Sequence, residues 1–98
     1  MEKMKSEANH TVSGFGSLFT KTMSDGAINL WQKELIALGI AVAKQCVPCF
    51  KLHVQKSLAA GATREQIIEA AGVAVMMGGG PAYTHVPIVI EALDELQN

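Results

Sequence analysis

The chain has no excess of basic residues and few aromatic ones. Its 98 residues carry a formal net charge of −1, and aromatic side chains make up only 5% of them. Proteins that bind nucleic acid usually neutralise phosphates with clustered lysine and arginine, and many stack aromatic rings on bases. Because both features are scarce here, the composition argues against a nucleic-acid partner.

Long uninterrupted apolar runs are also missing. The run over residues 35–43 ends at Lys44, and glycines together with Pro81 interrupt the run over residues 70–83. Both are shorter than the ~18 apolar residues that indicate a membrane-spanning helix. The first ten residues are polar and charged, and they lack the apolar centre of a secretory signal. We therefore predict a cytoplasmic protein with no membrane partner.

Cysteine is scarce as well, because the chain contains only Cys46 and Cys49. A small secreted scaffold held together by disulfides would have more cysteines, spread along the sequence. Two cysteines this close together in a reducing compartment indicate redox chemistry or metal binding instead.

Apolar side chains, in contrast, are abundant. Hydrophobic residues make up 49% of the chain and charged residues 17%. A single domain of this length has only a modest core of its own. Some apolar surface then needs a partner chain, and we predict a homo-oligomer. Residues 1–9 show little periodicity and are predicted to be an N-terminal tail, so the domain is expected to span residues 10–98.

Helical periodicity and capping signals predict an all-α fold of about five helices. Asn29 with Gln32, and Thr63 with Gln66, have the spacing of capping boxes. The segment 35–43 is apolar on every side, which predicts burial in an oligomer core. Met76 and Met77 are expected to fill the core. The predicted helices cover residues 10–23, 29–44, 46–61 and 63–78, with a last one from residue 81 that Pro87 kinks or splits.

The sequence Cys46-Val47-Pro48-Cys49 places two thiols at the predicted start of a helix. Residues i and i+3 share one face of a helix, and their separation suits a disulfide, whose Cα atoms lie roughly 4.4–6.8 Å apart. Free N–H groups and the positive end of the helix dipole stabilise a thiolate there. The spacing therefore favours redox chemistry at Cys46 and Cys49.

His53 follows Cys49 by four residues, so the helical period places it on the same stripe as both thiols. An imidazole there can exchange protons with a thiol at neutral pH. Glu34 lies just before the apolar run of the preceding helix, and a tight helical hairpin would bring it into the same pocket. We predict a site made of Cys46, Cys49, His53 and Glu34.

Other interpretations fit the same residues. The four side chains are acceptable zinc ligands, although a structural zinc site usually has four sulfur or nitrogen ligands and only three are present. An oligomeric module could use the thiols to sense redox state without turnover, or the cysteines could simply pack in the core. The glycines at 78–80 match no phosphate-binding fingerprint, so we interpret them as a helix break and expect no cofactor.

The segments 33–38 and 46–53, followed by 60–67 and 76–82, together resemble the alkylhydroperoxidase D (AhpD-like) branch of the carboxymuconolactone decarboxylase family. That branch has a glutamate, a CxxC pair and a histidine at these spacings, and the likeness extends over about residues 29–96. Its best-known members have a histidine directly before the second cysteine, where this chain has Pro48. This departure bears on peroxidase efficiency and on the preferred reductant.

The resemblance implies an antioxidant oxidoreductase, either a peroxidase or a disulfide reductase, that acts on hydroperoxides or disulfides. In the usual mechanism of the family, Cys49 would attack the peroxide and Cys46 would resolve the sulfenic acid into a disulfide. Glu34 and His53 would relay protons. An external thiol, of lipoyl or thioredoxin type, would then reduce the disulfide. The resemblance also implies a homo-oligomer, either a trimer or a hexamer.

Overall fold

A computed structural model describes residues 2–97, which form seven α-helices and no β-strand. The prediction of an all-α fold is therefore confirmed. The number of helices exceeds the expected five, because part of the predicted tail is helical and the last predicted helix is divided in two. The helices are α1 (Glu2–Glu7), α2 (Asn9–Thr22), α3 (Leu30–Ala43), α4 (Val47–Ala59), α5 (Arg64–Gly78), α6 (Gly80–Tyr83) and α7 (Val86–Gln97).

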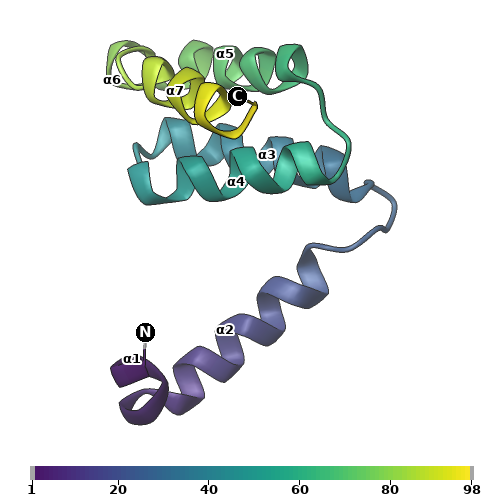
Figure 1. The fold of residues 1–98 in the computed structure, drawn as a ribbon, viewed down its shortest axis with the longest axis vertical. Helices are drawn as coiled ribbons and strands as arrows, with labels where there is room; N and C mark the ends of the chain where they lie inside the picture. Colours follow the sequence, from purple (N-terminus) through teal and green to yellow (C-terminus); the bar gives the residue numbers. More distant parts are fainter. Residues whose placement is uncertain (1, 98) are drawn as a thin grey trace.

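Helices α3 to α7 form a two-layered body, in which α3 and α4 make one layer and α5, α6 and α7 the other (Figure 1). The apolar sides of the two layers face each other and form the core. Its largest fully buried apolar side chains are Phe50, Leu38, Ile67, Leu93, Val42, Val54 and Val89. Because these residues come from α3, α4, α5 and α7, the body has its own core within one chain.

Both predicted capping boxes are present. The backbone N–H of Asn29 donates to Oε1 of Gln32 at 3.0 Å, and that of Thr63 donates to Oε1 of Gln66 at 2.9 Å. The hydroxyl of Thr63 in turn accepts from the N–H of Gln66 at 3.2 Å. These local hydrogen bonds fix the first residues of α3 and α5, as the sequence predicted.

The predicted glycine break lies between α5 and α6. Gly79 has a φ of +73°, a backbone conformation that favours glycine, and α5 ends at the residue before it. Pro87 lies in the first turn of α7, so the last predicted helix is split rather than kinked.

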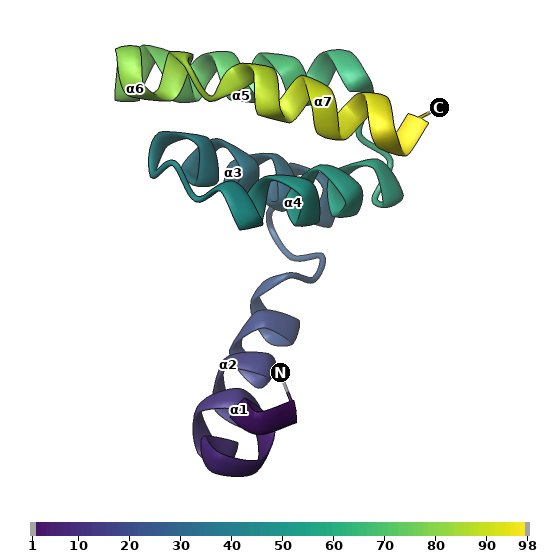
Figure 2. The same ribbon diagram turned by 60° about the vertical axis from the view of Figure 1, so that its left-hand side comes forward.

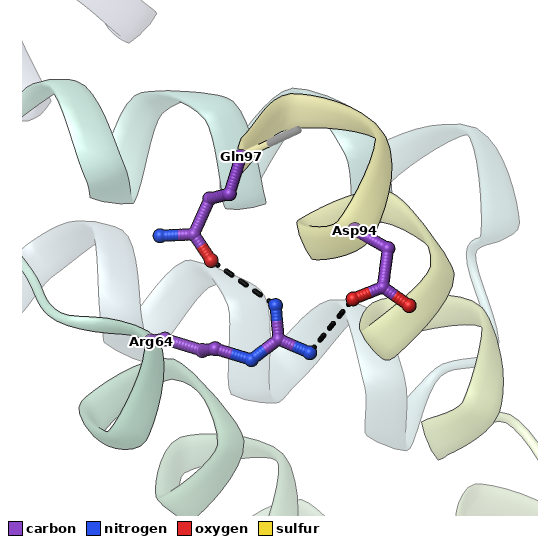
Figure 3. A network of polar contacts seen from close by, with 3 residues as sticks. All are labelled: Arg64, Asp94 and Gln97. Carbon is purple, nitrogen blue, oxygen red and sulfur yellow. Dashed lines mark hydrogen bonds and ion pairs between the residues drawn. The ribbon is translucent and has the colours of Figure 1, made fainter.

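Arg64, at the start of α5, forms hydrogen bonds with the C-terminal helix α7. Its guanidinium group donates to Oδ1 of Asp94 at 2.8 Å and to Oε1 of Gln97 at 3.1 Å (Figure 3). Both partners lie near the end of α7, so this network joins α5 and α7 of the second layer at the surface.

Helices α1 and α2 project from the body as an arm, which we define as residues 2–22 (Figure 2). Neither helix has a buried residue. The side chains of Phe15 and Leu18 are 64% and 62% exposed. The predicted tail thus contains the helix α1, which ends just before α2 begins, while the predicted domain boundary at residue 10 stays a prediction.

The apolar run of α3 is only partly covered within the single chain, and its burial in an oligomer core stays a prediction. Ile36 and Ile40 of the apolar run are about half exposed, because α4 and α5 cover only part of the surface of α3. The prediction that Met76 and Met77 fill the core is wrong, because their side chains are 72% and 75% exposed. None of the helices formed by residues 2–97 has both the length and the apolar character needed to cross a membrane.

Candidate functional site

The turn between α3 and α4 fixes the position of Cys46. The N–H of Cys46 donates to the carbonyl of Ala41 at 2.9 Å, and the N–H of Gln45 donates to that of Val42 at 3.1 Å. Gln45 has a φ of +58°, so the three features together form a Schellman motif that closes α3. Cys46 is also the N-cap of α4, and it is therefore held by both helices.

Cys46 and Cys49 form a disulfide at the start of α4, so the structure represents the oxidised state of the pair. Their Cα atoms are 5.4 Å apart, as the helical spacing predicts. The N–H of Cys49 donates to the carbonyl of Cys46 at 2.9 Å, and Pro48 occupies the first turn, where a missing N–H costs no helical hydrogen bond. Both cysteines are partly exposed.

His53 and Glu34 form a hydrogen-bonded pair between α4 and α3. Nδ1 of His53 lies 2.9 Å from Oε1 of Glu34, and the two side chains are only 13% and 4% exposed. The pairing depends on the antiparallel packing of α3 against α4, which the sequence suggested and could not establish. A buried carboxylate needs such a partner, because an unpaired charge in the interior is costly.

The histidine and the disulfide line the same open depression, which has a volume of about 410 Å³. Cys46, Cys49 and His53 line it from α4 and the preceding turn, and α3 supplies the rest of the wall. The α3 residues are Ala37, Ile40, Ala41 and Lys44. Three of the four predicted site residues therefore line one depression. Glu34 does not line it and is connected to it by the hydrogen bond with the imidazole of His53.

Glu34 also borders a second depression, of about 360 Å³, which contains Phe19 and Lys56 and neither cysteine. The Phe19 ring stacks on His53, with 6.3 Å between centroids and 16° between planes, and Nζ of Lys56 lies 5.4 Å from the Phe19 centroid. Sequence reasoning missed this role of Phe19. The contact could not be found from the sequence, because the approach of Phe19 to His53 depends on the direction in which α2 leaves the body.

The other histidines lie away from this site. Nδ1 of His85 lies 2.7 Å from the carbonyl of Pro81, and its ring packs edge-on against Phe50. Among residues 2–97, no group of three or more His, Cys, Asp or Glu side chains has an arrangement suited to a metal ion.

Comparison with known proteins relates this fold and site to a family. The profile of the carboxymuconolactone decarboxylase family matches residues 11–92, which is most of the chain. The chain belongs to this family. A family protein from Legionella pneumophila, solved by crystallography in its apo form, is 40% identical with a TM-score of 0.92. That similarity covers 99% of this chain and 87% of the Legionella chain, so it includes the arm.

Further similar proteins match over shorter parts of this chain. A Thermotoga maritima member, for which involvement in an antioxidative response has been suggested, is 26% identical with a TM-score of 0.83, over 89% of this chain and 90% of that one. An uncharacterized protein of the cox locus of Paracoccus denitrificans is 40% identical over 84% of this chain and 74% of its own length. An uncharacterized protein of Cupriavidus necator is 34% identical over 87% and 75%.

Proposed function

We propose that this member of the carboxymuconolactone decarboxylase family is a thiol-dependent peroxidase or disulfide reductase of the AhpD-like branch. The observation that carries the proposal is the redox pair Cys46–Cys49 in one depression with His53, whose Nδ1 is bonded to the buried Glu34. The suggested antioxidative role of the Thermotoga relative supports the same class of chemistry.

In the first step, the thiolate of Cys49 attacks the outer oxygen of a hydroperoxide ROOH. The O–O bond breaks, Cys49 becomes a sulfenic acid, and the alcohol ROH leaves after it gains a proton. Cys49 suits this role because it lies inside the first turn of α4, where free N–H groups and the helix dipole stabilise a thiolate. His53 lies one turn further along the same face.

In the second step, the thiol of Cys46 attacks the sulfenic sulfur, the disulfide forms and water leaves. One external dithiol, of lipoyl or thioredoxin type, then reduces the disulfide to two thiols and becomes a disulfide itself. With a disulfide substrate RSSR, the Cys49 thiolate instead forms a mixed disulfide and releases one RSH, and Cys46 then displaces the second RSH to form the same Cys46–Cys49 disulfide. Each step needs a proton at a defined sulfur or oxygen atom, and the depression provides one ionisable ring for that purpose.

His53 and Glu34 would relay these protons. An ionised carboxylate can only accept a hydrogen bond, so Glu34 fixes the proton of the neutral imidazole at Nδ1 and leaves Nε2 as the acceptor. Nε2 takes the proton of the thiol and later gives it to the leaving oxygen. Glu34 acts through His53 in this scheme and needs no contact with the substrate.

Steady-state turnover of a hydroperoxide with a dithiol reductant tests the proposal. We expect turnover in the wild type, none in Cys49→Ser, and a loss of about 10²-fold in His53→Gln, which keeps a polar side chain and removes the proton exchange. Lys51→Gln, on an exposed side of α4, is a matched control and should keep full activity. Wild-type protein that forms the disulfide and does not turn over would instead be a redox-sensing module.

The zinc alternative has its own test. Elemental analysis of the reduced protein after dialysis would detect one zinc per chain if Cys46, Cys49 and His53 held a structural ion. The proposal expects less than stoichiometric zinc and unchanged turnover after treatment with a chelator.

A further inference from the structure

We infer that the arm of one copy of this chain occupies an apolar groove between α3 and α5 of a second copy. The groove has a volume of about 410 Å³, and no charged side chain lines it. Its lining residues are Leu35, Ile36, Gly39, Ile40 and Ala43 of α3 with Ala70, Val73, Ala74 and Met77 of α5. This inference concerns assembly and does not depend on the proposed redox activity.

The shape of the groove fits a helix. Small residues form its floor, because α3 and α5 approach each other closely at Gly39, where an added Cβ would lie 3.6 Å from the carbonyl oxygen of Ala70. Larger side chains form the rim, and Met77 is 75% exposed in the single chain. A convex helix fills such a concave surface with apolar contacts, whereas two concave grooves facing each other would leave a hollow between them.

The arm offers a matching apolar face. Val12, Phe15, Leu18 and Phe19 lie on one side of α2, by the helical period. Phe19, at the end nearer the body, packs on His53, and its ring lies 6.2 Å from that of Phe15. Phe15 and Leu18 continue this face outward with no cover from their own chain. At about 1.5 Å per residue, α2 is long enough to follow the two turns of α3 that line the groove.

The arm cannot fill the groove of its own chain in this conformation. It leaves the body from the layer of α3 and α4 and runs away from α5, as both views show (Figures 1 and 2). The elbow between α2 and α3 is held by hydrogen bonds: Nζ of Lys33 donates to the carbonyls of Thr22 and Ser24, and the N–H of Leu30 donates to Asp25. A second copy therefore supplies the occupant.

The groove lies beside the depression that contains the two cysteines. Ile40 lines both the groove and the depression that contains Cys46 and Cys49. A docked arm would thus lie next to that depression and extend its apolar wall. Because every copy has both an arm and a groove, the contact can be repeated around a closed ring or exchanged between two copies.

Two charge substitutions test the inference through the oligomeric state of the full chain, measured by analytical ultracentrifugation at tens of micromolar. We expect the wild type to be an oligomer, and Leu18→Asp on the arm and Met77→Asp in the groove each to be monomeric. Both side chains are exposed in the single chain, so circular dichroism should show unchanged helix content. Val73→Asp provides a second groove variant. Ser13→Asp, on the opposite side of α2, and Gln55→Asp on α4 are controls that should stay oligomeric.

Mixing the two monomeric variants gives the decisive result. The Leu18→Asp chain retains its groove and the Met77→Asp chain retains its arm, so together they can form one contact and should yield a 1:1 complex of twice the monomer mass. Two monomers that stay separate on mixing would overturn the inference. It would also be overturned by a monomeric wild type, or if only the arm variant or only the groove variant dissociated, since these results indicate arm–arm or groove–groove pairing.

Discussion

The arm and the body differ in where their apolar side chains lie. In the body, residues from four helices bury one another, and Phe50 is fully enclosed. In the arm, α2 has an apolar stripe of comparable character, yet none of its residues is buried. An amphipathic helix gains most of its stability from packing, which the helices of the body find within one chain and α2 of the arm largely does not.

The proposed redox site lies where these two regions meet. Glu34, Cys46, Cys49 and His53 belong to the body, and Phe19 of the arm covers one face of the imidazole. The body thus fixes the positions of the sulfur atoms and of the hydrogen-bonded pair His53–Glu34, while the Phe19 ring of the arm packs against His53.

The largest effect should come from matched phenylalanine substitutions in the two regions. Phe50→Ala removes a fully buried ring and should lower the free energy of unfolding by about 3–5 kcal/mol. Phe15→Ala removes an exposed ring and should change it by about 0.5 kcal/mol or less in dilute solution, where chains are separate. Urea unfolding at submicromolar concentration measures both. Equal losses would show that the arm is part of the cooperative body.

A smaller effect is expected when the buried pair loses its histidine. His53→Ala leaves the Glu34 carboxylate at 4% exposure without its partner, which should cost about 1–3 kcal/mol of stability. The double variant Glu34→Leu with His53→Ala removes the uncompensated acid and should recover part of that loss. Urea unfolding of the two variants provides the comparison, and a double variant no more stable than His53→Ala would contradict this role of the pair.

The contact between arm and body should have a still smaller effect. Phe19→Ala removes the ring that stacks on His53, and should cost about 0.5–1.5 kcal/mol, the usual worth of an aromatic pair. The more specific readout is the NMR shift of the His53 Cε1 proton, which should move when the ring is lost. Phe15→Ala is the matched control and should leave that shift unchanged, because its ring reaches His53 only through Phe19. Two identical spectra would place α2 elsewhere in solution.

The surface network of the second layer should matter least. Arg64 and Asp94 are both substantially exposed, so Asp94→Asn should lower the free energy of unfolding by about 0.2–1 kcal/mol. The loss should shrink at high salt, because screening already weakens the wild-type pair. Thermal unfolding at low and high ionic strength measures both effects, and a loss that is large and independent of salt would indicate a buried role for this pair.

The sequence predicted what depends on local interactions. The bounds of α3, α4 and α5 follow from capping boxes, from Pro48 in a first turn and from Gly79 at a helix end. The shared face of Cys46, Cys49 and His53 follows from the helical period alone. These features need only residues within a few positions of one another, so their prediction required no knowledge of packing.

What the sequence could not predict depends on which helices touch. The pairing of Glu34 with His53 requires α3 to pack against α4, and the stacking of Phe19 requires the direction that α2 takes from the elbow. The exposure of Met76 and Met77 was missed for a related reason. Apolar periodicity marks a face that will be covered and does not say whether the same chain or another covers it.

The most direct test of the central claim is a single-turnover experiment on the reduced protein. After one equivalent of hydroperoxide is added and the reaction is stopped with an alkylating agent, the mass of the whole chain reports both thiols. We predict a chain that has lost two hydrogen atoms and takes up no alkyl group, because Cys46 and Cys49 close an intramolecular disulfide. A chain that remains doubly alkylated would contradict the account.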